Sequence, residues 1–411
     1  MAKQYLTGLD IGTHSLKAAV AEVDSDGRTS LIRLVKTPSS GMRKGNIDDL
    51  AEMTRSLNIM LSEIKKVSRN ASRGIFLNVG SADTRIQSSR GIVAVSRADY
   101  EIHEDDIDRA VQASQAINLP PNRMVLHAIT REFIVDGVGD IRDPLGMVGN
   151  RLEVNSLIID AFAPAVKNLT KSVEMAGATV GGLIFSPLAS SRSVLTKNQK
   201  ELGVVFIDIG FGTTSICVYE ENKLVHASVF PFGSGHITND LAIGLKTSVE
   251  AAEAVKLTFG SVYLRGGSSR EHIDLKKIDP SARMNVSRRF IADIIEVRLA
   301  EIFEFVNNEL KLIGKAGKLP VGAVIVGGGS KLPGIVDLAK DELGLPAQIG
   351  IPDTSSIEMP NGELSLQVED PEFSGAIGLL LWGREQAFGG GDLNRGIGNR
   401  LIQLFKDLLP S

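Results

Sequence analysis

The feature of this sequence that most constrains its fold is a phrase that occurs twice, about 200 residues apart. The first copy is TGLDIGTHSLKAAVAEVDSDGR, at the start of the chain, and the second is VFIDIGFGTTSICVYEENKL. Each has an apolar run, Asp-Ile-Gly, a turn of small residues and a second alternating run, which predicts a β-hairpin. Two similar hairpins this far apart predict a duplicated fold with one copy in each lobe, and not a short-period repeat.

The segments around the hairpins predict an α/β protein. Apolar residues at helical spacing predict helices over 47–67 and in EIHEDDIDRAVQASQAI, HITNDLAIGLKTSVEAAEAVKLTFG and VSRRFIADIIEVRLAEIFEFVNNELKLI. Apolar or alternating runs predict strands in RGIFLNVG, RMVLHAITREFIVDG, NRLEVNSLIIDAF and VGAVIVGGG. The length of 411 residues suits two to three domains, each large enough for a core of its own.

Composition and missing motifs exclude several classes of function. A formal net charge of −4 argues against a general nucleic-acid binder. Cys217 is the single cysteine, so no internal disulfide is expected, and histidine and cysteine never cluster at metal-ligand spacing. The sequence has no G-x-S-x-G, H-E-x-x-H or P-loop motif. We also expect neither a signal peptide nor a membrane-spanning segment.

The two hairpins carry the chemistry of a phosphate site. A glycine directly after Asp-Ile lets the backbone approach a phosphate closely, and the following hydroxyl and basic side chains add donors. The candidate residues are Gly12, Thr13, His14 and Lys17 in the first hairpin and Gly210, Gly212, Thr213 and Thr214 in the second. Asp10 and Asp208 end the two strands, and facing carboxylates suit one Mg²⁺ held mostly through water.

Two further segments complete a candidate nucleotide site. Glu253 and Lys256 lie three residues apart on one helix face, where they can reach ribose hydroxyls and a base edge. After the strand GAVIV, a run of small residues can pass flat against a purine and its ribose; it comprises Gly327, Gly328, Gly329 and Ser330. Each segment alone is common, since Glu-x-x-Lys is usually a solvated ion pair, and their order along the chain supports the assignment.

This order of motifs resembles the superfamily of actin, heat-shock chaperones and sugar kinases. The matching stretches are LDIGTHSLK, GGLIFSPLASSRSVL, VFIDIGFGTTSICVY and GAVIVGGGSKLPG. Within it the chain most resembles the FtsA family of bacterial cell-division proteins. The stretch from NLPPNRMVLHAI to NRLEVNSLII is similar to the family's inserted subdomain 1C, and no actin-type insertion fits after the first hairpin. The resemblance implies an α/β, actin-like (ribonuclease H-like) duplicated two-lobe ATPase fold.

The resemblance also implies domain boundaries and cofactors. Residues 1–82 and 162–197 would form the first lobe (1A), 83–161 subdomain 1C, 198–232 and 305–383 the second lobe (2A), and 233–304 subdomain 2B. ATP and Mg²⁺ would bind between the lobes, with Gly235 added to the site. Several relatives carry Glu or Gln where this chain has Ser186, and a serine is a poor general base. We therefore expect slow or no ATP hydrolysis and name no catalytic residue.

The C-terminus predicts a tethered amphipathic helix. Residues 384–395, REQAFGGGDLNR, are expected to be a flexible linker before a helix over 396–411. At ~100° per residue one arc of that helix is wholly apolar and the other polar, with a modest positive bias. The apolar arc comprises Ile397, Leu401, Ile402, Leu404, Phe405, Leu408 and Leu409. A helix docked on its own core needs no tether, so the pattern favours a helix lying in the headgroup region of a membrane.

The resemblance further implies partners. The family binds the C-terminal tail of FtsZ, the tubulin-like ring protein, on subdomain 2B. It also self-associates into actin-like filaments at the cytoplasmic side of the cell membrane, and would meet other divisome proteins through 1C. The candidate FtsZ-binding residues are Arg288, Arg289, Arg298 and Glu301. A PilM-type pilus-assembly protein and a superfamily small-molecule kinase are the alternatives; the first should lack the tethered tail, and the second needs an acceptor pocket with a catalytic Asp.

Overall fold

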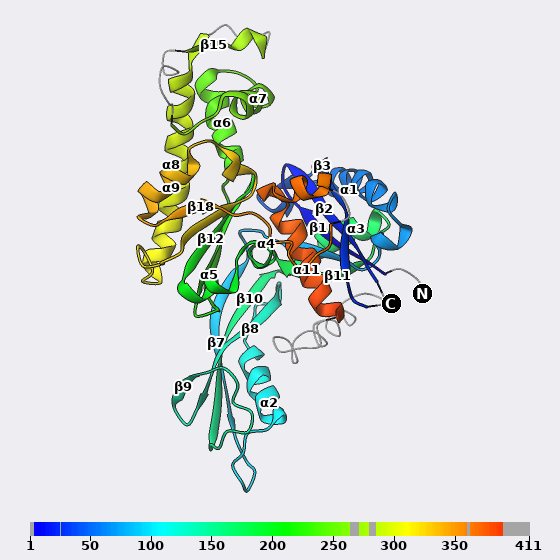
Figure 1. Cartoon of the computed structure of the whole chain (residues 1–411), viewed down its shortest axis with the longest axis vertical. Helices are drawn as coiled ribbons and strands as arrows, with labels where there is room; N and C mark the ends of the chain where they lie inside the picture. The colour runs from blue at the N-terminus through cyan, green and yellow to red at the C-terminus, as the bar shows by residue number, and fades with distance from the viewer. Residues whose placement is uncertain (1–3, 25, 264–270, 279–284, 360–361, 389–411) are drawn as a thin grey trace.

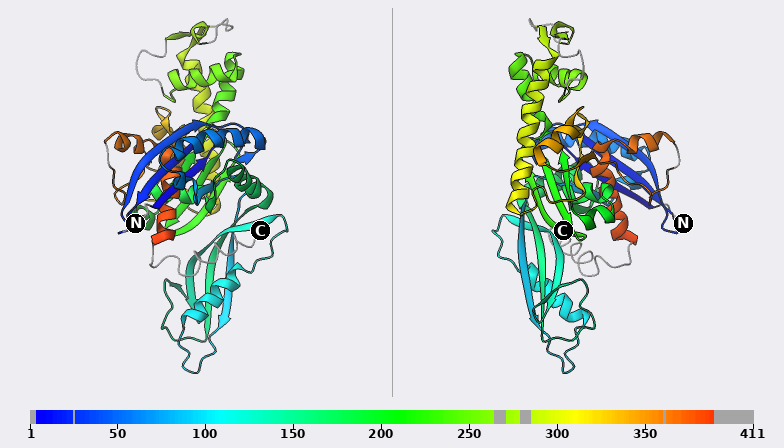
Figure 2. Two further views of the ribbon diagram at one scale, coloured as in Figure 1. Left: turned by 90° about the vertical axis from the view of Figure 1, so that its right-hand side faces the viewer. Right: turned by 60° about the vertical axis from the view of Figure 1, so that its left-hand side comes forward.

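The computed structural model describes residues 4–24, 26–263, 271–278, 285–359 and 362–388. Two α/β lobes lie side by side, with a mainly helical unit above the second lobe and a β-rich unit below (Figure 1). The two further views show the same elongated arrangement (Figure 2). The tail residues 397–409 lie outside the described part of the chain.

The first lobe is built on a five-stranded sheet with the order β11-β6-β1-β2-β3. Its strands are β1 (Gln4–Ile11), β2 (Ser15–Val23), β3 (Thr29–Pro38), β6 (Ile75–Val79) and β11 (Val180–Phe185). The first three form an antiparallel meander, and β6 and β11 add in parallel. Parallel neighbours need a crossover, and α1 (Leu50–Lys65) and α3 (Ala163–Met175) lie in these connections. Short elements β4 (Met42–Arg43), β5 (Asn46–Ile47) and η1 (Arg69–Ser72) complete the lobe.

The second lobe repeats this topology strand for strand. Its sheet has the order β18-β17-β12-β13-β14, again with a three-strand antiparallel meander and two parallel additions. The strands are β12 (Val204–Ile209), β13 (Thr214–Glu220), β14 (Lys223–Phe230), β17 (Gly322–Val326) and β18 (Ala347–Ile349). The duplication predicted from the repeated phrase is therefore confirmed. α9 (Ile335–Leu343) packs on this lobe, and η4 (Gly328–Lys331) follows β17.

The unit below the lobes is the inserted segment. A four-stranded sheet with the order β7-β10-β8-β9 is covered by α2 (Glu104–Gln115) and has a small core of its own (Figure 1). The strands are β7 (Arg85–Ala94), β8 (Arg123–Val135), β9 (Val138–Ile141) and β10 (Arg151–Phe162). Three acidic residues fill the first turn of α2, as the helix dipole favours.

The unit above the second lobe shares that lobe's core. It comprises α6 (Ser234–Leu245), α7 (Val249–Phe259), β15 (His272–Asp274), η3 (Leu275–Lys277), β16 (Asn285–Ser287) and the start of α8 (Arg288–Leu312). The 25-residue α8 runs from this unit down the second lobe (Figure 1). Ile291 near its start and Leu310 near its end belong to one buried cluster. Because one helix serves both units, the upper unit is braced on the lobe.

Two helices fill the space between the lobes. α4 (Ser186–Val194) packs against α11 (Ser374–Phe388), which also lies along β1. On α11, Leu379 packs with Phe206 of the second lobe, whereas Leu380 packs with Ala19 of the first. α11 is therefore apolar on several sides because it is covered from several sides. α5 (Lys197–Leu202), α10 (Gly362–Val368) and η5 (Pro371–Phe373) complete the described elements.

The placement of α11 corrects two expected boundaries. Residues 374–383 were expected in the second lobe, but they pack on β1 and in a cluster with first-lobe side chains. The expected linker begins at residue 384, but α11 continues through Phe388. Arg384 Nη1 donates to the Ser356 carbonyl at 2.8 Å and Glu385 pairs with Arg192, and these contacts tie the end of the helix to other parts of the protein. The remainder of the expected linker lies outside the described residues.

Candidate functional site: the cleft between the lobes

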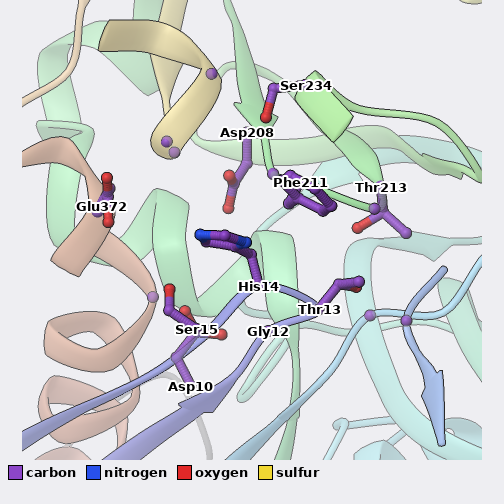
Figure 3. A pocket seen from close by; sticks show the side chains of 18 of the residues that line it. Asp10, Gly12, Thr13, His14, Ser15, Asp208, Phe211, Thr213, Ser234 and Glu372 are labelled. Carbon is purple, nitrogen blue, oxygen red and sulfur yellow. The ribbon is translucent and has the colours of Figure 1, made fainter. Parts of the chain in front are cut away.

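The two Asp-Ile-Gly hairpins face each other across one cleft of about 560 Å³ (Figure 3). The predicted residues that line it are Asp10, Gly12, Thr13, His14, Lys17, Asp208, Gly210, Gly212, Thr213, Glu253, Lys256, Gly327, Gly328 and Gly329. Residues from four separate segments of the sequence thus meet in one place. The fold brings them together because β1 and β12 end toward the cleft and β17 runs parallel to β12.

The two loops have the same local construction. A Cβ at Gly12 would lie 2.8 Å from the Ser15 carbonyl oxygen, and one at Gly210 would lie 3.0 Å from that of Thr213. In each loop the first glycine therefore allows the backbone to fold back on a residue three positions later, which is Ser15 at the start of β2 in the first loop and Thr213 just before β13 in the second. In the second loop the Gly210 N–H closes the turn by donating to the Thr213 carbonyl at 2.9 Å. Tight glycine turns of this kind are typical of phosphate loops.

Three predicted residues support the site without lining it. Thr214 starts β13 and is completely buried. Gly235 lies under the ring of Phe211, and its N–H donates to the Phe211 carbonyl at 2.8 Å. Ser330 is also buried, and its Oγ donates to the Gly327 carbonyl at 2.7 Å, closing the glycine turn. Their neighbours Thr213, Ser234 and Gly329 provide the lining at these points.

The loops touch each other directly. The rings of His14 and Phe211 stack with centroids 4.7 Å apart (Figure 3). A Cβ at Gly212 would lie 2.5 Å from Thr13 Oγ1, so the second loop approaches the first closely there. Burial lowers the pKa of His14 below its usual value, which favours a neutral ring near pH 7.

The carboxylates of Asp10 and Asp208 form the floor of the cleft. Asp10 accepts a 2.7 Å hydrogen bond from Asn78 Nδ2 and lies 3.6 Å from Lys17 Nζ. Asp208 accepts from Ser190 Oγ at 3.2 Å. Burial raises the pKa of Asp10, and burial together with the charge of Asp10 raises the pKa of Asp208 to about 6. Two partly buried carboxylates whose charges repel fit the hard-ligand chemistry of Mg²⁺.

The Glu253–Lys256 pair is part of a buried network, not a solvated ion pair. Lys256 Nζ lies 2.7 Å from Glu253 Oε2 and also donates to Thr238 Oγ1 at 2.8 Å. Only 5% of the Lys256 side chain is exposed, and burial lowers its pKa. Its Nζ lies 5.4 Å from the centroid of Phe211, within range of a cation–π interaction. The network therefore links α7 to the second phosphate loop.

Sequence reasoning missed a charged bridge across the cleft. Glu372 in η5 points into the cleft (Figure 3) and pairs with Lys36 of β3 and with Lys331 of η4, the latter at 3.2 Å. Burial alone would raise the pKa of Glu372, but the hydrogen bond and charge of Lys36 and the charges of Lys17 and Lys331 lower it. These residues come from three distant segments, so no spacing in the sequence could have linked them.

Ser186, which the resemblance puts where several relatives carry Glu or Gln, is among the residues that line the cleft. It begins α4, and a Cβ at Gly80 would lie 2.7 Å from its Cβ. Its hydroxyl is not a basic group at neutral pH. The nearby carboxylates, Asp10, Asp208 and Glu372, are each already engaged by a neighbouring side chain.

The four predicted partner-binding residues separate into two groups. Arg298 Nε and Nη2 donate to both oxygens of Asp240, at 2.6 and 3.1 Å, and its Nη1 donates to Glu301 at 2.6 Å. Arg289 is largely exposed, with Asp293 at 4.0 Å. Arg288 instead lines the cleft. The structure therefore does not place all three arginines on one face.

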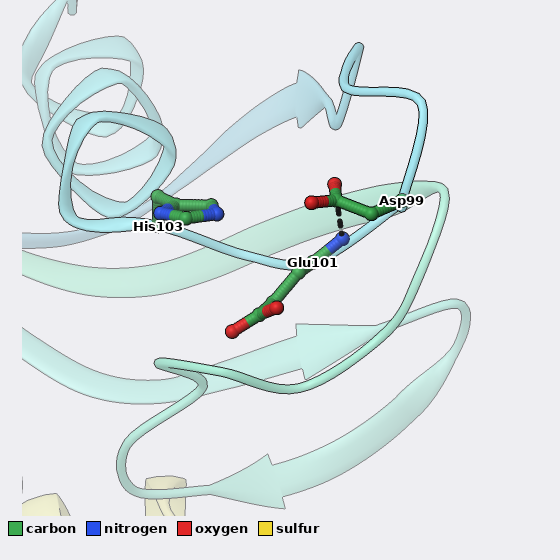
Figure 4. A group of neighbouring side chains, drawn as sticks. All are labelled: Asp99, Glu101 and His103. Atoms are coloured by element: carbon green, nitrogen blue, oxygen red, sulfur yellow. Dashed lines mark hydrogen bonds between the residues drawn. The ribbon is translucent and has the colours of Figure 1, made fainter.

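A group of Asp99, Glu101 and His103 lies in the inserted unit (Figure 4). The Glu101 N–H donates to Asp99 Oδ1 at 3.2 Å, so a local turn accounts for part of the arrangement. Both carboxylates are exposed. Exposed acidic side chains at this density are common on protein surfaces, and we assign no metal to them.

None of the described helices is both long and apolar enough to cross a membrane. Two lobes of identical topology around one cleft define an actin-like protein. Among solved structures, the PilM–PilN type IV pilus biogenesis complex matches 92% of this chain and 98% of its own at 21% identity, with a TM-score of 0.66. The structure of MreB5 of Spiroplasma citri bound to ADP matches 94% of this chain and 99% of its own at 13% identity, with a TM-score of 0.53. At such identities these matches establish the fold alone.

The chain belongs to the FtsA family of bacterial cell-division proteins. The family model for cell division protein FtsA matches residues 205–378, and the model for the SHS2 domain inserted in FtsA matches residues 81–160. Cell division protein FtsA of Pseudomonas aeruginosa is 32% identical over 93% of this chain and 89% of its own. The Neisseria meningitidis protein of the same name is 35% identical over 92% of this chain and 90% of its own. The inserted unit is therefore the family's SHS2 domain.

Proposed function

We propose that this protein binds ATP and Mg²⁺ between its lobes and uses the nucleotide to control its assembly. The observation that carries the proposal is the pair of phosphate loops, Gly12–His14 and 210–213, facing each other across one cleft. When bound, Mg²⁺ would offset charge on the phosphate oxygens, with Asp10 and Asp208 holding its water ligands. The solved relatives of this fold include proteins bound to ADP and AMPPNP.

Hydrolysis is proposed to be slow. A fast ATPase needs a group that positions and deprotonates water. The family resemblance gives that role to the position of Ser186, and the support from the structure is that Ser186 lines the cleft. The nucleotide then acts mainly by holding the lobes together. Titration of the purified protein with a fluorescent ATP analogue tests binding, and a turnover assay without partners tests the rate. Turnover of many ATP per second would overturn the switch role, and absence of binding would overturn the nucleotide site.

We further propose that the protein polymerises on the cytoplasmic face of the cell membrane. The support is the sequence of the tail, whose apolar arc suits an interfacial helix. One such helix would bind weakly and reversibly, because its ordering opposes binding. A polymer presents many tails together, and avidity multiplies their affinity. ATP-dependent filaments lying on a lipid monolayer, seen by electron microscopy, are the expected result.

The membrane proposal has a matched pair of variants. Phe405→Glu places a charge in the apolar arc, whereas Gln403→Glu places the same charge on the polar side. We expect Phe405→Glu and deletion of 396–411 to abolish sedimentation with anionic liposomes, and Gln403→Glu to retain most of it. Equal sedimentation of all four proteins would refute the anchor.

The proposed partner is the acidic C-terminal tail of FtsZ, docked on α8. Arg298 provides a cation there and is held by Asp240 of α6. Val297, the preceding residue on α8, and Ile243, three residues after Asp240 on α6, are strongly exposed apolar side chains. Because Asp240 and Glu301 already hold Arg298, its reversal would also leave two acids without their cation. We expect Arg298→Glu to weaken tail-peptide binding at least tenfold, while Lys340→Glu on α9 leaves it unchanged. Unchanged affinity for Arg298→Glu would remove this assignment.

A further inference from the structure

Two consecutive arginines begin α8 and lie in different environments. Arg289 is 72% exposed at its side chain, and its nearest acid is Asp293 at 4.0 Å. Arg288 is only 30% exposed and lines the same cleft as the phosphate loops. The sequence offered no reason to separate them, since both belong to the run SRR. Their different positions indicate different roles.

The position of Arg288 is fixed by the hairpin that precedes α8. His272 of β15 pairs with Ser287 of β16, which also caps α8 by accepting from the Phe290 N–H at 3.2 Å. The Arg288 N–H donates to the Glu271 carbonyl, and its Nη1 donates to Glu271 Oε2, both at 2.9 Å. Backbone and side chain are therefore held by one neighbour, which limits the freedom of the guanidinium.

One edge of this guanidinium lacks a partner. Arg288 Nε is buried and has no hydrogen-bond acceptor among the described residues. A buried N–H without an acceptor is unfavourable, because it has lost water and gained nothing in return. Glu271 meanwhile balances the charge of Arg288, so little net positive charge remains for a phosphate. The partly exposed group instead offers a planar surface to the cleft.

The cleft wall on the side of subdomain 2B suits a base more than a phosphate. It is formed by Leu257 and Gly260 near the end of α7 and by Leu332 and Pro333 after the glycine turn. A Cβ at Gly260 would lie 3.2 Å from Leu332 Cδ2, so the two segments pack together as one surface. The phosphate loops belong to the strand ends of the lobes, whereas Arg288 belongs to 2B, like α7.

We propose that Arg288 contacts the base of the bound nucleotide, with its guanidinium plane against the purine ring. An arginine plane stacks well on an extended π-surface, which a lysine ammonium does not reproduce. The inference rests on the proposed ATP site and assigns Arg288 to that site in place of the FtsZ docking surface. It adds to the site a residue of subdomain 2B that would contact the nucleotide through its base.

The test is a competition assay on the full-length protein, using a fluorescent ATP analogue displaced by ATP or by inorganic tripolyphosphate. Arg288→Ala should weaken ATP binding about tenfold and leave tripolyphosphate binding unchanged. Arg288→Lys should resemble the alanine variant, because it keeps charge but loses the plane. Arg289→Ala, the matched control, should bind ATP like the original protein. Thermal melting verifies that each variant folds.

Each outcome has a separate meaning. Equal ATP affinity in Arg288→Ala and the original protein would overturn the inference while leaving the ATP site intact. An equal loss of ATP and tripolyphosphate affinity would overturn the base contact and indicate a phosphate contact. If the original protein itself fails to bind ATP, the proposed function fails first. Should Arg288→Ala not fold, Glu271→Gln replaces it in the test. Because this change releases the guanidinium, it should weaken the binding of ATP but not that of tripolyphosphate. Unchanged ATP binding would count against the inference.

Discussion

His14 and Phe211 stack with ring centroids 4.7 Å apart and planes 25° from parallel. One ring comes from each phosphate loop, so this contact joins the two lobes at the point where phosphates are proposed to bind. Lys256 approaches the Phe211 ring from α7, and Gly235 packs beneath it. Phe211 therefore connects the first lobe, the second lobe and subdomain 2B through a single side chain.

Removal of this ring should loosen the closed cleft. Phe211→Ala eliminates the stack and the cation–π contact, each worth on the order of 0.5–1.5 kcal/mol. We expect the nucleotide to dissociate about tenfold faster, as measured by stopped-flow release of a fluorescent ATP analogue. Phe305→Ala, at a half-exposed aromatic side chain on α8, should leave the rate unchanged. A Phe211→Ala rate equal to that of the original protein would show that the stack does not hold the cleft closed.

The approach of Gly212 to Thr13 gives a second test of closure. Gly212→Ala puts a Cβ 2.5 Å from Thr13 Oγ1, so the loops must separate. We expect ATP affinity to fall about tenfold, in line with overpacking penalties of roughly 1–3 kcal/mol. Thr13→Gly in the same chain should restore part of it by removing the clash. Gly362→Ala, where a Cβ meets no atom within 4 Å, is the control for a glycine substitution.

Much of the fold and the phosphate site could be predicted because short local motifs in the sequence determine them. Gly12 and Gly210 each follow Asp-Ile at a strand end, and the backbone there requires the residue type that the sequence contains. Burial of Lys256 could not be predicted, because Glu-x-x-Lys has the same spacing on exposed and covered helices. Whether the fold buries such a Glu-x-x-Lys pair depends on where its helix packs, which the local pattern does not reveal.

The remaining differences depend on packing between distant segments. α11 was assigned to the second lobe by its place in the sequence, but its apolar residues face both lobes, so helical periodicity gives no single direction. Glu372 and Arg288 reach the cleft although η5 and the start of α8 lie far from both phosphate loops in the sequence. Contacts between segments this far apart follow no fixed spacing in the sequence, so the sequence alone does not show which residues will meet.

The Lys36–Glu372–Lys331 bridge should slow opening of the lobes. Glu372→Gln removes the carboxylate that both lysines share, and the Glu372 side chain is only 12% exposed. We expect faster nucleotide release, by about threefold to tenfold for a partly buried charged pair. Asp337→Asn breaks an exposed pair with Lys340 in α9 and should have no effect. Identical release rates for both variants would contradict a role for the bridge.

His127 should make stability depend on pH. It is buried, its Nε2 accepts the Phe185 N–H at 2.9 Å, and burial lowers its pKa to about 4. Because the unfolded chain has a higher histidine pKa, near 6.5, it binds more protons between these values. Stability should therefore fall as the pH drops from 6.5 to 4, by about 3 kcal/mol. His127→Gln keeps an acceptor without titrating, so urea unfolding should show a shallower loss over this range; parallel curves would contradict the assignment.

Asp208 should control how pH affects metal-assisted nucleotide binding. Burial and the charge of Asp10 raise its pKa to about 6, so its ionised form is disfavoured in the ligand-free fold. A raised carboxyl pKa means that the folded state holds the proton more tightly than the unfolded state. This contribution to stability is lost as the pH rises through 6, and Asp208→Asn should stabilise the ligand-free protein at pH 7 by roughly 1–3 kcal/mol.

Metal binding should show the opposite trend, because Mg²⁺ requires the ionised carboxylate. From pH 5 to pH 7.5 the ionised fraction of a group with a pKa of about 6 grows roughly tenfold. The gain in ATP affinity on adding Mg²⁺ should grow by a similar factor in the original protein and stay flat in Asp208→Asn. Calorimetric titration in two buffers of different ionisation enthalpy should also detect a proton released on Mg·ATP binding near pH 6. An equal Mg²⁺ effect at both pH values in the original protein would exclude Asp208 from the metal site.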